Sequence, residues 1–368
     1  MTPLAVLDLP PGPELLDALR HALEGGPAIL PLDPRLPDPQ RRRVVAAARP
    51  DQPVHPDVAV VIATSGSTGA PKSVELTRKA LHASAEASLA RLDATPADRW
   101  LCCLPTSHIA GIQVLVRALV LGASPVIHPR FDPAAVAEAQ ATHVSLVPTM
   151  LTRLLDAGVD VSRFDRILLG GADASPALLA RARAAGGRVV TTYGMTETAG
   201  GCVYDGRPLD GVEVEIGPDG RIRIRGPVLA RGYRGRAGEF ASGWLHTDDL
   251  GRWREDGRLR VLGRADDLIV TGGENVAPAA VAALLAEHPA VAEAAVVGRP
   301  DPEWGQRVAA VVVPADPSQP PTLDALRRFV TARATPAHAP RELTLTDALP
   351  LLPNGKLDRT ALLRALRA

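Results

Sequence analysis

The sequence predicts an α/β protein: a large amino-terminal domain of layered α/β sheets with a β-rich subdomain, followed by a small α+β domain. The chain has 368 residues, 46% of them hydrophobic, whereas a single core usually stops growing at roughly 250 to 300 residues. Short β-branched runs alternate with helix-like segments in its first half, which is typical of strands joined by helices. After this alternation, a turn-rich segment predicts the β-rich subdomain, and a mixture of helix and strand patterns predicts the small α+β domain.

The elements of the first half follow from this alternation. The strands are predicted at 58–65, 124–128, 143–148, 165–171 and 188–194, and the helices at 77–92, 110–121, 133–141, 149–156 and 176–186. Thr77 is the expected cap of the first of these helices. Ligands of open α/β sheets bind outside the carboxyl ends of the strands, so the Gly-rich stretches that follow the strands are candidate binding loops.

The second half predicts a β-rich subdomain and then a smaller unit. Residues 202–264 contain "GPDGR" and "REDGR" turns between short alternating runs, which predict β-hairpins. Beyond them we expect helices at 278–287 and 322–333, strands at 293–300, 306–315 and 342–346, and a closing helix from Asp358. We place the domain boundary between Ala265 and Asp266, giving domains 1–265 and 266–368.

Composition favours a small-molecule function. Lys plus Arg and Asp plus Glu are both 41, so no basic excess favours a nucleic acid or an anionic membrane. The longest apolar tract, 109–127, contains Gln113 and Arg117, which are costly in a bilayer. The start of the chain lacks the basic region of an export signal, and we expect a cytoplasmic protein. The three cysteines are expected to be small buried residues without a metal-ligand spacing.

The stretch "ATSGSTGAPKSVELT", 63–77, nearly contains a Gly-x4-Gly-Lys-Ser phosphate loop. Pro71 stands where the second glycine would be, and "SVELT" predicts a strand where that loop would open a helix. A Walker-type ATPase is therefore disfavoured. The hydroxyls of Ser65, Ser67 and Thr68, together with Lys72, still describe an anion cradle, although a plain hairpin turn is the alternative.

The segment "TSGSTGAPKSV" resembles the signature loop of the adenylate-forming superfamily, which contains acyl-CoA synthetases, adenylation domains and luciferases. The resemblance implies that superfamily's fold, here with a shortened amino-terminal lobe, and the use of ATP, Mg²⁺ and CoA. It implies that the ATP phosphates are held by Thr64, Ser65, Gly66, Ser67, Thr68, Gly69 and Lys72. Ser73 departs from the family, which usually has glycine after this lysine.

Further motifs resemble the rest of the family's nucleotide site. "LLGGADAS", "TTYGMTETAGG", "GWLHTDDLGRW" and "GRADDLIVTGGENVAP" occur in the family's order. They imply further ATP contacts by Gly171, Ala172, Thr192, Tyr193, Gly194, Met195, Thr196, Asp249 and Arg264. Glu197, with Thr68, would hold Mg²⁺, whose preference for oxygen ligands suits a carboxylate. Asp248 replaces the family's glycine before the ribose-binding aspartate.

The resemblance also implies an acyl pocket, a hinge and a catalytic lysine. The pocket residues would be Ser107, His108, Thr149, Gly170, Thr192, Gly194 and Gly200. Asp266 would be the hinge of a mobile small domain, and Gly272 and Gly273 would border the CoA channel. The catalytic residues would be Lys72, His108, Glu197 and Lys356. Outside this context, a lone histidine is usually packed and a lysine in a turn is usually solvated.

The short amino-terminal lobe and "TTYGMTETAGGCVYDGRPLDGV" are similar to the branch of the superfamily that activates o-succinylbenzoate for menaquinone biosynthesis. Another small or aryl acid, or acyl transfer to a carrier protein, stays open as an alternative. A nucleotide-binding regulator without turnover is a further alternative, which the presence of Lys72, Glu197, Asp249 and Lys356 disfavours. The resemblance also implies a homo-oligomer, since members are often dimers.

Overall fold

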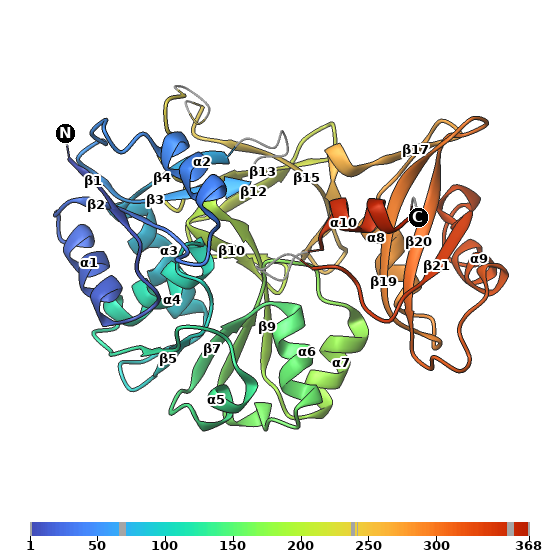
Figure 1. The fold of residues 1–368 in the computed structure, drawn as a ribbon, viewed down its shortest axis with the longest axis horizontal. Helices are drawn as coiled ribbons and strands as arrows, with labels where there is room; N and C mark the ends of the chain where they lie inside the picture. The colour runs from blue at the N-terminus through green and yellow to red at the C-terminus, as the bar shows by residue number, and fades with distance from the viewer. Residues whose placement is uncertain (1, 66–70, 237–239, 241, 352–356, 367–368) are drawn as a thin grey trace. The chain divides into compact units, whose positions relative to one another are not determined.

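The computed structural model describes residues 2–65, 71–236, 240, 242–351 and 357–366 (Figure 1). The chain forms two compact units. Unit 1 comprises residues 1–171, 182–215 and 223–246, and unit 2 comprises residues 172–181, 216–222 and 247–368. The boundary between Ala265 and Asp266 stays a prediction.

The first sheet of unit 1 has the strand order β1-β2-β3-β4-β14. Its strands are β1 (Leu4–Leu7), β2 (Ala28–Pro31), β3 (Val58–Ser65), β4 (Pro71–Thr77) and β14 (Gly232–Tyr233), and helices α1 (Pro13–Leu23) and α2 (Asp38–Ala48) lie between the first three strands in sequence. β1, β2 and β3 are parallel, whereas β4 is antiparallel to both β3 and β14. No element is predicted before residue 58, so β1, α1, β2 and α2 are additions, and the strand at Trp100–Cys102 described below is another.

The second sheet of unit 1 has the strand order β11-β10-β9-β8-β7-β5-β6. Its strands are β5 (Trp100–Cys102), β6 (Val126–Ile127), β7 (His143–Leu146), β8 (Arg166–Leu169), β9 (Val189–Met195), β10 (Gly200–Tyr204) and β11 (Arg207–Pro208). The strands from β9 to β6 are parallel. The predicted strands in this part of the chain are confirmed, with ends that differ by a few residues.

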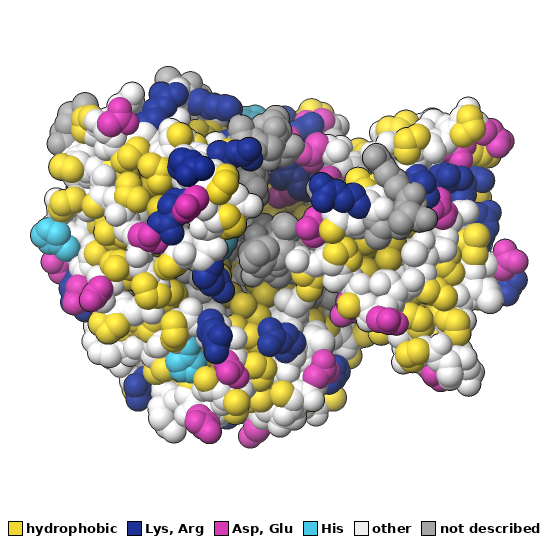
Figure 2. All heavy atoms as spheres, in the orientation of Figure 1, with side chains coloured by type: hydrophobic (Ala, Val, Ile, Leu, Met, Phe, Trp, Pro, Cys, Tyr) yellow, Lys and Arg dark blue, Asp and Glu magenta, His cyan; other side chains and the backbone are white. Residues whose placement is uncertain are grey.

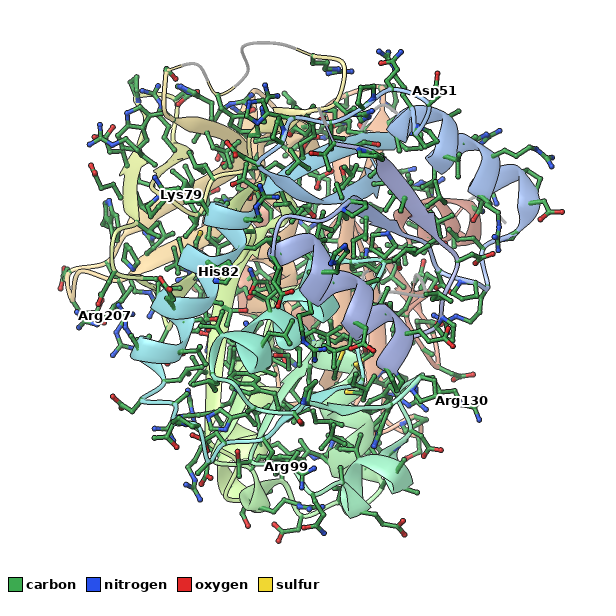
Figure 3. All side chains as sticks on the ribbon, turned by 90° about the vertical axis from the view of Figure 1, so that its left-hand side faces the viewer. Asp51, Lys79, His82, Arg99, Arg130 and Arg207 are labelled. Carbon is green, nitrogen blue, oxygen red and sulfur yellow. The ribbon has the colours of Figure 1, made fainter. Side chains whose placement is uncertain are left out.

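The predicted helices of the first half are also confirmed. They are α3 (Arg78–Arg91), α4 (Ile109–Val120), α5 (Pro133–Glu138), α6 (Pro148–Asp156) and α7 (Pro176–Ala184). The Thr77 hydroxyl accepts the N–H of Ala80 at 3.0 Å, as a cap of α3 should. Lys79 and His82 lie on the outer side of α3 (Figure 3), while its other side packs on α4 and β10.

The β-rich segment forms another sheet, of order β12-β13-β15-β16. Its strands are β12 (Glu213–Ile216), β13 (Arg221–Arg225), β15 (Leu245–Trp253) and β16 (Leu259–Arg264). This confirms the predicted change from alternating strands and helices to short strands and turns.

The end of unit 2 contains the predicted small α+β fold. Its sheet has the order β18-β17-β20-β19, with β21 pairing β20. The elements are β17 (Ile269–Thr271), β18 (Glu274–Val276), α8 (Pro278–Leu285), β19 (Val291–Asp301), β20 (Gly305–Pro314), α9 (Leu323–Thr331), β21 (Glu342–Leu345) and α10 (Arg359–Ala365). α8 and α9 bury Val281, Leu285, Leu326 and Val330 together with the inner residues of this sheet. Asp358 caps α10 by accepting the N–H of Ala361.

The surface charges are mixed and the three cysteines are buried, as the composition predicts (Figure 2). Acidic and basic side chains are interspersed on the face seen in Figure 2. Cys102, Cys103 and Cys202 are buried, and burial raises the pKa of the Cys102 and Cys202 thiols to about 12. Within the part of the chain that the structure describes, no helix is long and apolar enough to span a membrane.

A buried polar network joins β5 and β7 in unit 1. Thr142 donates its hydroxyl proton to Asp98 at 3.0 Å, so the contact between Thr142 and Nδ1 of His143 at 2.9 Å requires His143 to carry its proton on Nδ1. The His143 ring packs on Trp100 with centroids 4.8 Å apart, and Arg117 lies 4.4 Å from the Trp100 ring. Burial lowers the pKa of His143, which therefore stays neutral.

His143 should make the folded state less stable in mild acid. Because its folded-state pKa is below the ordinary value of about 6.5, the unfolded chain binds the proton first, and stability is lost as pH falls below about 6.5. Asp98 titrates in a lower range: burial alone would raise its pKa, but hydrogen bonds from Thr95 and Thr142 outweigh burial and lower it. The free energy of urea unfolding, measured between pH 7.5 and 5.5, should fall less steeply in His143→Asn. An unchanged slope would contradict this assignment.

Candidate active site

Strands β3 and β4 place Thr64 and Lys72 opposite each other, beside the predicted phosphate loop. Their register pairs Thr64 with Lys72 and Ser65 with Pro71, and the Thr64 hydroxyl donates to the Lys72 carbonyl at 3.3 Å. Pro71 begins a strand, not a helix, as the sequence predicts. Four further residues of the predicted phosphate loop lie outside the described residues: Gly66, Ser67, Thr68 and Gly69. The side chain of Ser65 is not described either.

Ser73, the departure from the family's usual glycine, is packed inside the first sheet. It pairs with Ala63 across β3 and β4, and its side chain is 3% exposed. Its carbonyl accepts the N–H of Arg234 at 2.8 Å. Its hydroxyl is buried and has no hydrogen-bond partner within the described part of the chain. Ser73 therefore places a buried hydroxyl in β4 at a position that is regularly paired with β3.

Lys72, Tyr233 and Glu197 form one contact chain. Glu197 lies on a short 3-10 helix, Thr196–Thr198, directly after β9. The Tyr233 hydroxyl donates to Oε1 of Glu197 at 2.7 Å, and the Lys72 ammonium lies 5.1 Å from the centroid of the Tyr233 ring. An ammonium within about 6 Å of an aromatic face is attracted by the ring quadrupole. The predicted phosphate-binding cation and the predicted magnesium ligand thus share one aromatic neighbour.

Glycines allow close backbone approach where β8 and β9 end. A Cβ on Gly170 would lie 2.2 Å from the Thr192 hydroxyl oxygen, and a Cβ on Gly194 would lie 2.1 Å from the Gly200 carbonyl oxygen. A side chain at Gly194 would clash with backbone, and a side chain at Gly170 would require the Thr192 hydroxyl to move. Gly194 pairs with Gly201, and Met195 with Gly200, across β9 and β10. Gly170, Thr192, Gly194 and Gly200 are therefore neighbours, as their assignment to one pocket requires.

The remaining predicted pocket residues follow neighbouring strands of the same sheet. Ser107 and His108 lie in the turn after β5, and Thr149 lies in the first turn of α6, after β7. β5, β7, β8 and β9 are parallel neighbours, so their carboxyl ends meet at one edge of the sheet. His108 is exposed, and it contributes to lowering the pKa of Asp33, although the hydrogen bonds from Arg35 are the main cause.

Arg264 is surrounded by carboxylates in unit 2. It pairs with Asp249 across β15 and β16, and their side chains approach to 3.8 Å. Its Nε and one terminal nitrogen donate to both oxygens of Asp266, at 2.9 and 3.0 Å. Asp248, which replaces the family's glycine, lies 3.3 Å from Arg264 and also pairs with Arg221. These acids raise the pKa of Arg264, with Asp266 the largest contributor.

Gly272 and Gly273 form the turn between β17 and β18. Their φ angles are +58° and +81°, a region that favours glycine. A Cβ on Gly272 would lie 2.7 Å from the Trp304 ring, whereas one on Gly273 would meet nothing within 4 Å. The Gly272 N–H donates to the Trp304 carbonyl at 3.0 Å. The loop assigned to the CoA channel is thus a tight turn against an aromatic ring.

Comparisons with known proteins agree with these observations. A model of the AMP-binding enzyme family matches residues 15–234, and a model of the AMP-binding enzyme C-terminal domain matches residues 280–356. The chain belongs to the AMP-binding enzyme family. It is 44% identical to a probable 2-succinylbenzoate–CoA ligase of Mycobacterium tuberculosis, over 95% of this chain and 94% of that protein.

Solved structures of AMP-binding enzymes share the fold. The o-succinylbenzoate CoA synthetase of Bacillus subtilis, in complex with the acyl-adenylate OSB-AMP, superposes with a TM-score of 0.84 and 29% identity, over 98% of this chain and 88% of that chain. The same enzyme in complex with ATP and a magnesium ion superposes with a TM-score of 0.82, at the same identity and coverage. The predicted superfamily and its fold are confirmed.

The structure adds one residue that sequence reasoning missed. Tyr233 was not singled out, although a tyrosine after a glycine in "RGYRG" was a signal, since the chain has only three tyrosines. Lys356 lies outside the described residues, and Ala172 follows Gly171 in the exposed loop after β8. The roles of these and the other site residues of this AMP-binding enzyme stay predictions.

Alanine at the two turn glycines should distinguish the strain of a positive φ from a clash with Trp304. Gly273→Ala should lower the free energy of unfolding by about 1 to 2 kcal/mol, the cost of a left-handed alanine. Gly272→Ala should cost about 1 to 3 kcal/mol more, because the Trp304 ring must shift. Urea unfolding monitored by tryptophan fluorescence measures both. Equal losses for the two variants would show that Trp304 exerts no steric constraint.

Proposed function

We propose that this chain is an AMP-forming acid-thiol ligase that activates o-succinylbenzoate with ATP and transfers it to CoA, a reaction of menaquinone biosynthesis. The similarity to a probable 2-succinylbenzoate–CoA ligase over 95% of the chain carries the proposal. The contacts among Lys72, Tyr233 and Glu197 support the proposal, because one tyrosine contacts both the lysine that would bind phosphate and the glutamate that would bind magnesium. The use of ATP and CoA suits the cytoplasm, and formation of a homo-oligomer stays a prediction.

The proposed nucleotide contacts follow the strand ends and loops of each unit. In unit 1, Thr64 and Lys72 flank the loop that would wrap the phosphates, and Tyr193 at the end of β9 would stack on adenine. In unit 2, Asp249 would accept both ribose hydroxyls, which suits a carboxylate, beside Arg264. Arg221 and Arg264 partly neutralise Asp248, so the extra carboxylate adds less repulsion toward ATP.

The residues present fit a magnesium ion that is held mainly by its substrate. Within the described residues, no group of three or more His, Cys, Asp or Glu side chains is arranged so that it could hold a metal ion by itself. Mg²⁺ in nucleotide enzymes is usually held by one or two carboxylates plus phosphate oxygens. Glu197, fixed by Tyr233, supplies such a carboxylate. When bound, the ion would neutralise charge on the phosphates.

In the first half-reaction, a carboxylate oxygen of the acid would attack the α-phosphorus of ATP. A new P–O bond forms as the bond to the β-phosphate oxygen breaks, giving acyl-adenylate and pyrophosphate. Lys72, and Lys356 from the end of unit 2, would offset the repulsion between the carboxylate and the triphosphate. His108 and the small residues at the carboxyl edge of the second sheet would line the acyl pocket.

In the second half-reaction, the CoA thiol would lose its proton and attack the acyl carbonyl, and AMP would leave with the bonding electrons. The small domain, predicted as residues 266–368, would turn about Asp266, withdraw Lys356 and present the Gly272 and Gly273 turn to the pantetheine chain. The second carboxylate of o-succinylbenzoate suits the polar groups among the pocket residues: Ser107, Thr149 and Thr192, with the backbone at Gly194. Another small or aryl acid is the alternative substrate.

Product analysis tests the substrate. Purified protein with ATP, Mg²⁺, CoA and o-succinylbenzoate should give AMP, pyrophosphate and a CoA thioester in equal amounts, whereas benzoate, hexanoate or no acid should give none. Chromatography with mass spectrometry measures all three products. AMP formed better with another acid would keep the chemistry and reject the substrate, while ADP and phosphate would reject the reaction class.

Lys356→Ala should separate the two half-reactions. Because Lys356 would meet the triphosphate only during adenylation, its loss should slow acyl-adenylate formation by at least about 100-fold, the scale reported for removal of a transition-state donor. Thioester formation from supplied acyl-adenylate should be spared. Lys79→Ala is the matched control, because Lys79 is an exposed lysine of α3. Equal loss of both half-reactions would contradict the predicted motion of the small domain, residues 266–368.

A further inference from the structure

We infer that Tyr233 is a positioning residue for the nucleotide site: its hydroxyl orients Glu197 toward the magnesium ion, while its ring holds the Lys72 ammonium. The inference rests on the proposed function, in which Glu197 is the magnesium ligand and Lys72 binds phosphate. The observations that carry it are the hydrogen bond to Oε1 of Glu197 at 2.7 Å and the ring-to-ammonium distance of 5.1 Å.

Glu197 needs an external partner to fix its side chain. It lies on a single turn of 3-10 helix, in which a glutamate side chain keeps most of its rotational freedom. Its own backbone is held, because its carbonyl accepts the N–H of Ala230 at 2.8 Å. A carboxylate only accepts hydrogen bonds, so Tyr233 must be the donor. This bond engages Oε1 and thereby restricts the direction in which the carboxylate faces.

The strand register explains how one ring also reaches Lys72. Tyr233 pairs with Val74 across β14 and β4. Side chains alternate along a strand, so Val74 and Lys72, two positions apart, lie on the same face as Tyr233. Diagonal neighbours on one face are within reach of an aromatic side chain and a lysine. The register, not a flexible loop, therefore sets the distance between the ring and the ammonium.

Tyr233 is itself held on several sides. Glu75, 6% exposed, pairs with Arg234 at 2.9 Å and with Arg231 at 3.1 Å, so the residues that flank β14 are tied to β4. The ring of Phe240 packs on the Tyr233 ring with centroids 5.7 Å apart. A group that orients a metal ligand must have its own rotamer locked, and Tyr233 meets this requirement.

The first experiment measures ATP binding by calorimetry with and without Mg²⁺, in the absence of acid and CoA. Tyr233→Phe keeps the ring over Lys72 and removes only the hydroxyl. We expect it to weaken the Mg²⁺-dependent part of ATP binding about 10-fold, within the range of about 10 to 100-fold typical for partners of metal ligands, and to leave ATP binding without Mg²⁺ unchanged. Tyr233→Leu, which also removes the ring, should weaken ATP binding under both conditions.

Tyr204→Phe is the matched control. Tyr204 is buried, whereas Tyr233 is half-buried, and the Tyr204 hydroxyl is hydrogen-bonded to Ser88 at 2.7 Å, so Tyr204→Phe makes the same chemical change at a tyrosine that contacts neither Glu197 nor Lys72 in the described contacts. It should bind ATP and Mg²⁺ like the unchanged protein. Circular dichroism melting shows whether each variant is folded. Equal losses in the two Tyr→Phe variants would overturn the inference, as would a Tyr233→Phe loss that is independent of Mg²⁺.

A double-mutant cycle tests whether Tyr233 acts through Glu197. If it does, Tyr233→Phe should change ATP binding with Mg²⁺ in the unchanged background but not in a Glu197→Gln background. The same loss in both backgrounds would overturn the inference.

In turnover, Tyr233→Phe should raise the Mg²⁺ concentration for half-maximal rate without changing KM for o-succinylbenzoate. Because binding is measured without acid, a wrong substrate assignment leaves this test intact, and it is detected separately by product analysis.

Discussion

The antiparallel pairing of β4 with β3 on one side and β14 on the other is the constraint on which the candidate site of unit 1 depends. The first pair places Thr64 opposite Lys72, and the second places Tyr233 opposite Val74. A slip of one residue would turn Lys72 or Tyr233 to the opposite face. Charged pairs between Glu75 and the arginines that flank β14 hold this register, since a slip that separated Glu75 from both arginines would leave a buried charge unpaired.

The second sheet of unit 1 contributes by a different principle. Its parallel strands bring the turns after β5, β7, β8 and β9 to one edge. Glycines at that edge, such as Gly170 and Gly194, remove side chains where the backbone and Thr192 come closest. The missing Cβ atoms thus let the backbone of β9 and β10 and the Thr192 side chain pack closely at this edge, and Ser107, His108 and Thr149 follow neighbouring strands. The glycines and the polar residues both lie at or just after the carboxyl ends of these strands.

Much of the fold and of the candidate site could be predicted from the sequence. Alternating β-branched runs located β3 and β7 to β9, and Thr77 located the start of α3, because hydrophobic periodicity and helix caps are local signals. Tyr233 was missed because its role depends on pairing with a strand more than 150 residues earlier, which no local pattern encodes. The fate of Asp248 was also unpredictable, since its partner Arg221 comes from another strand.

Strand β4 is occupied on both faces, and this bears on how the chain can change by mutation. Lys72 and Val74 share one face with Tyr233, while Ser73 and Glu75 alternate with them and are buried. Replacing this ionic cluster by apolar residues would require Glu75 in β4 to change together with Arg231 and Arg234. A single substitution at Ser73 or Glu75 would therefore alter both the stability of the folded protein, and with it the protein's abundance, and its affinity for the nucleotide. The strand should have low mutational tolerance along its length, and compensating changes should arise in pairs across β4 and β14.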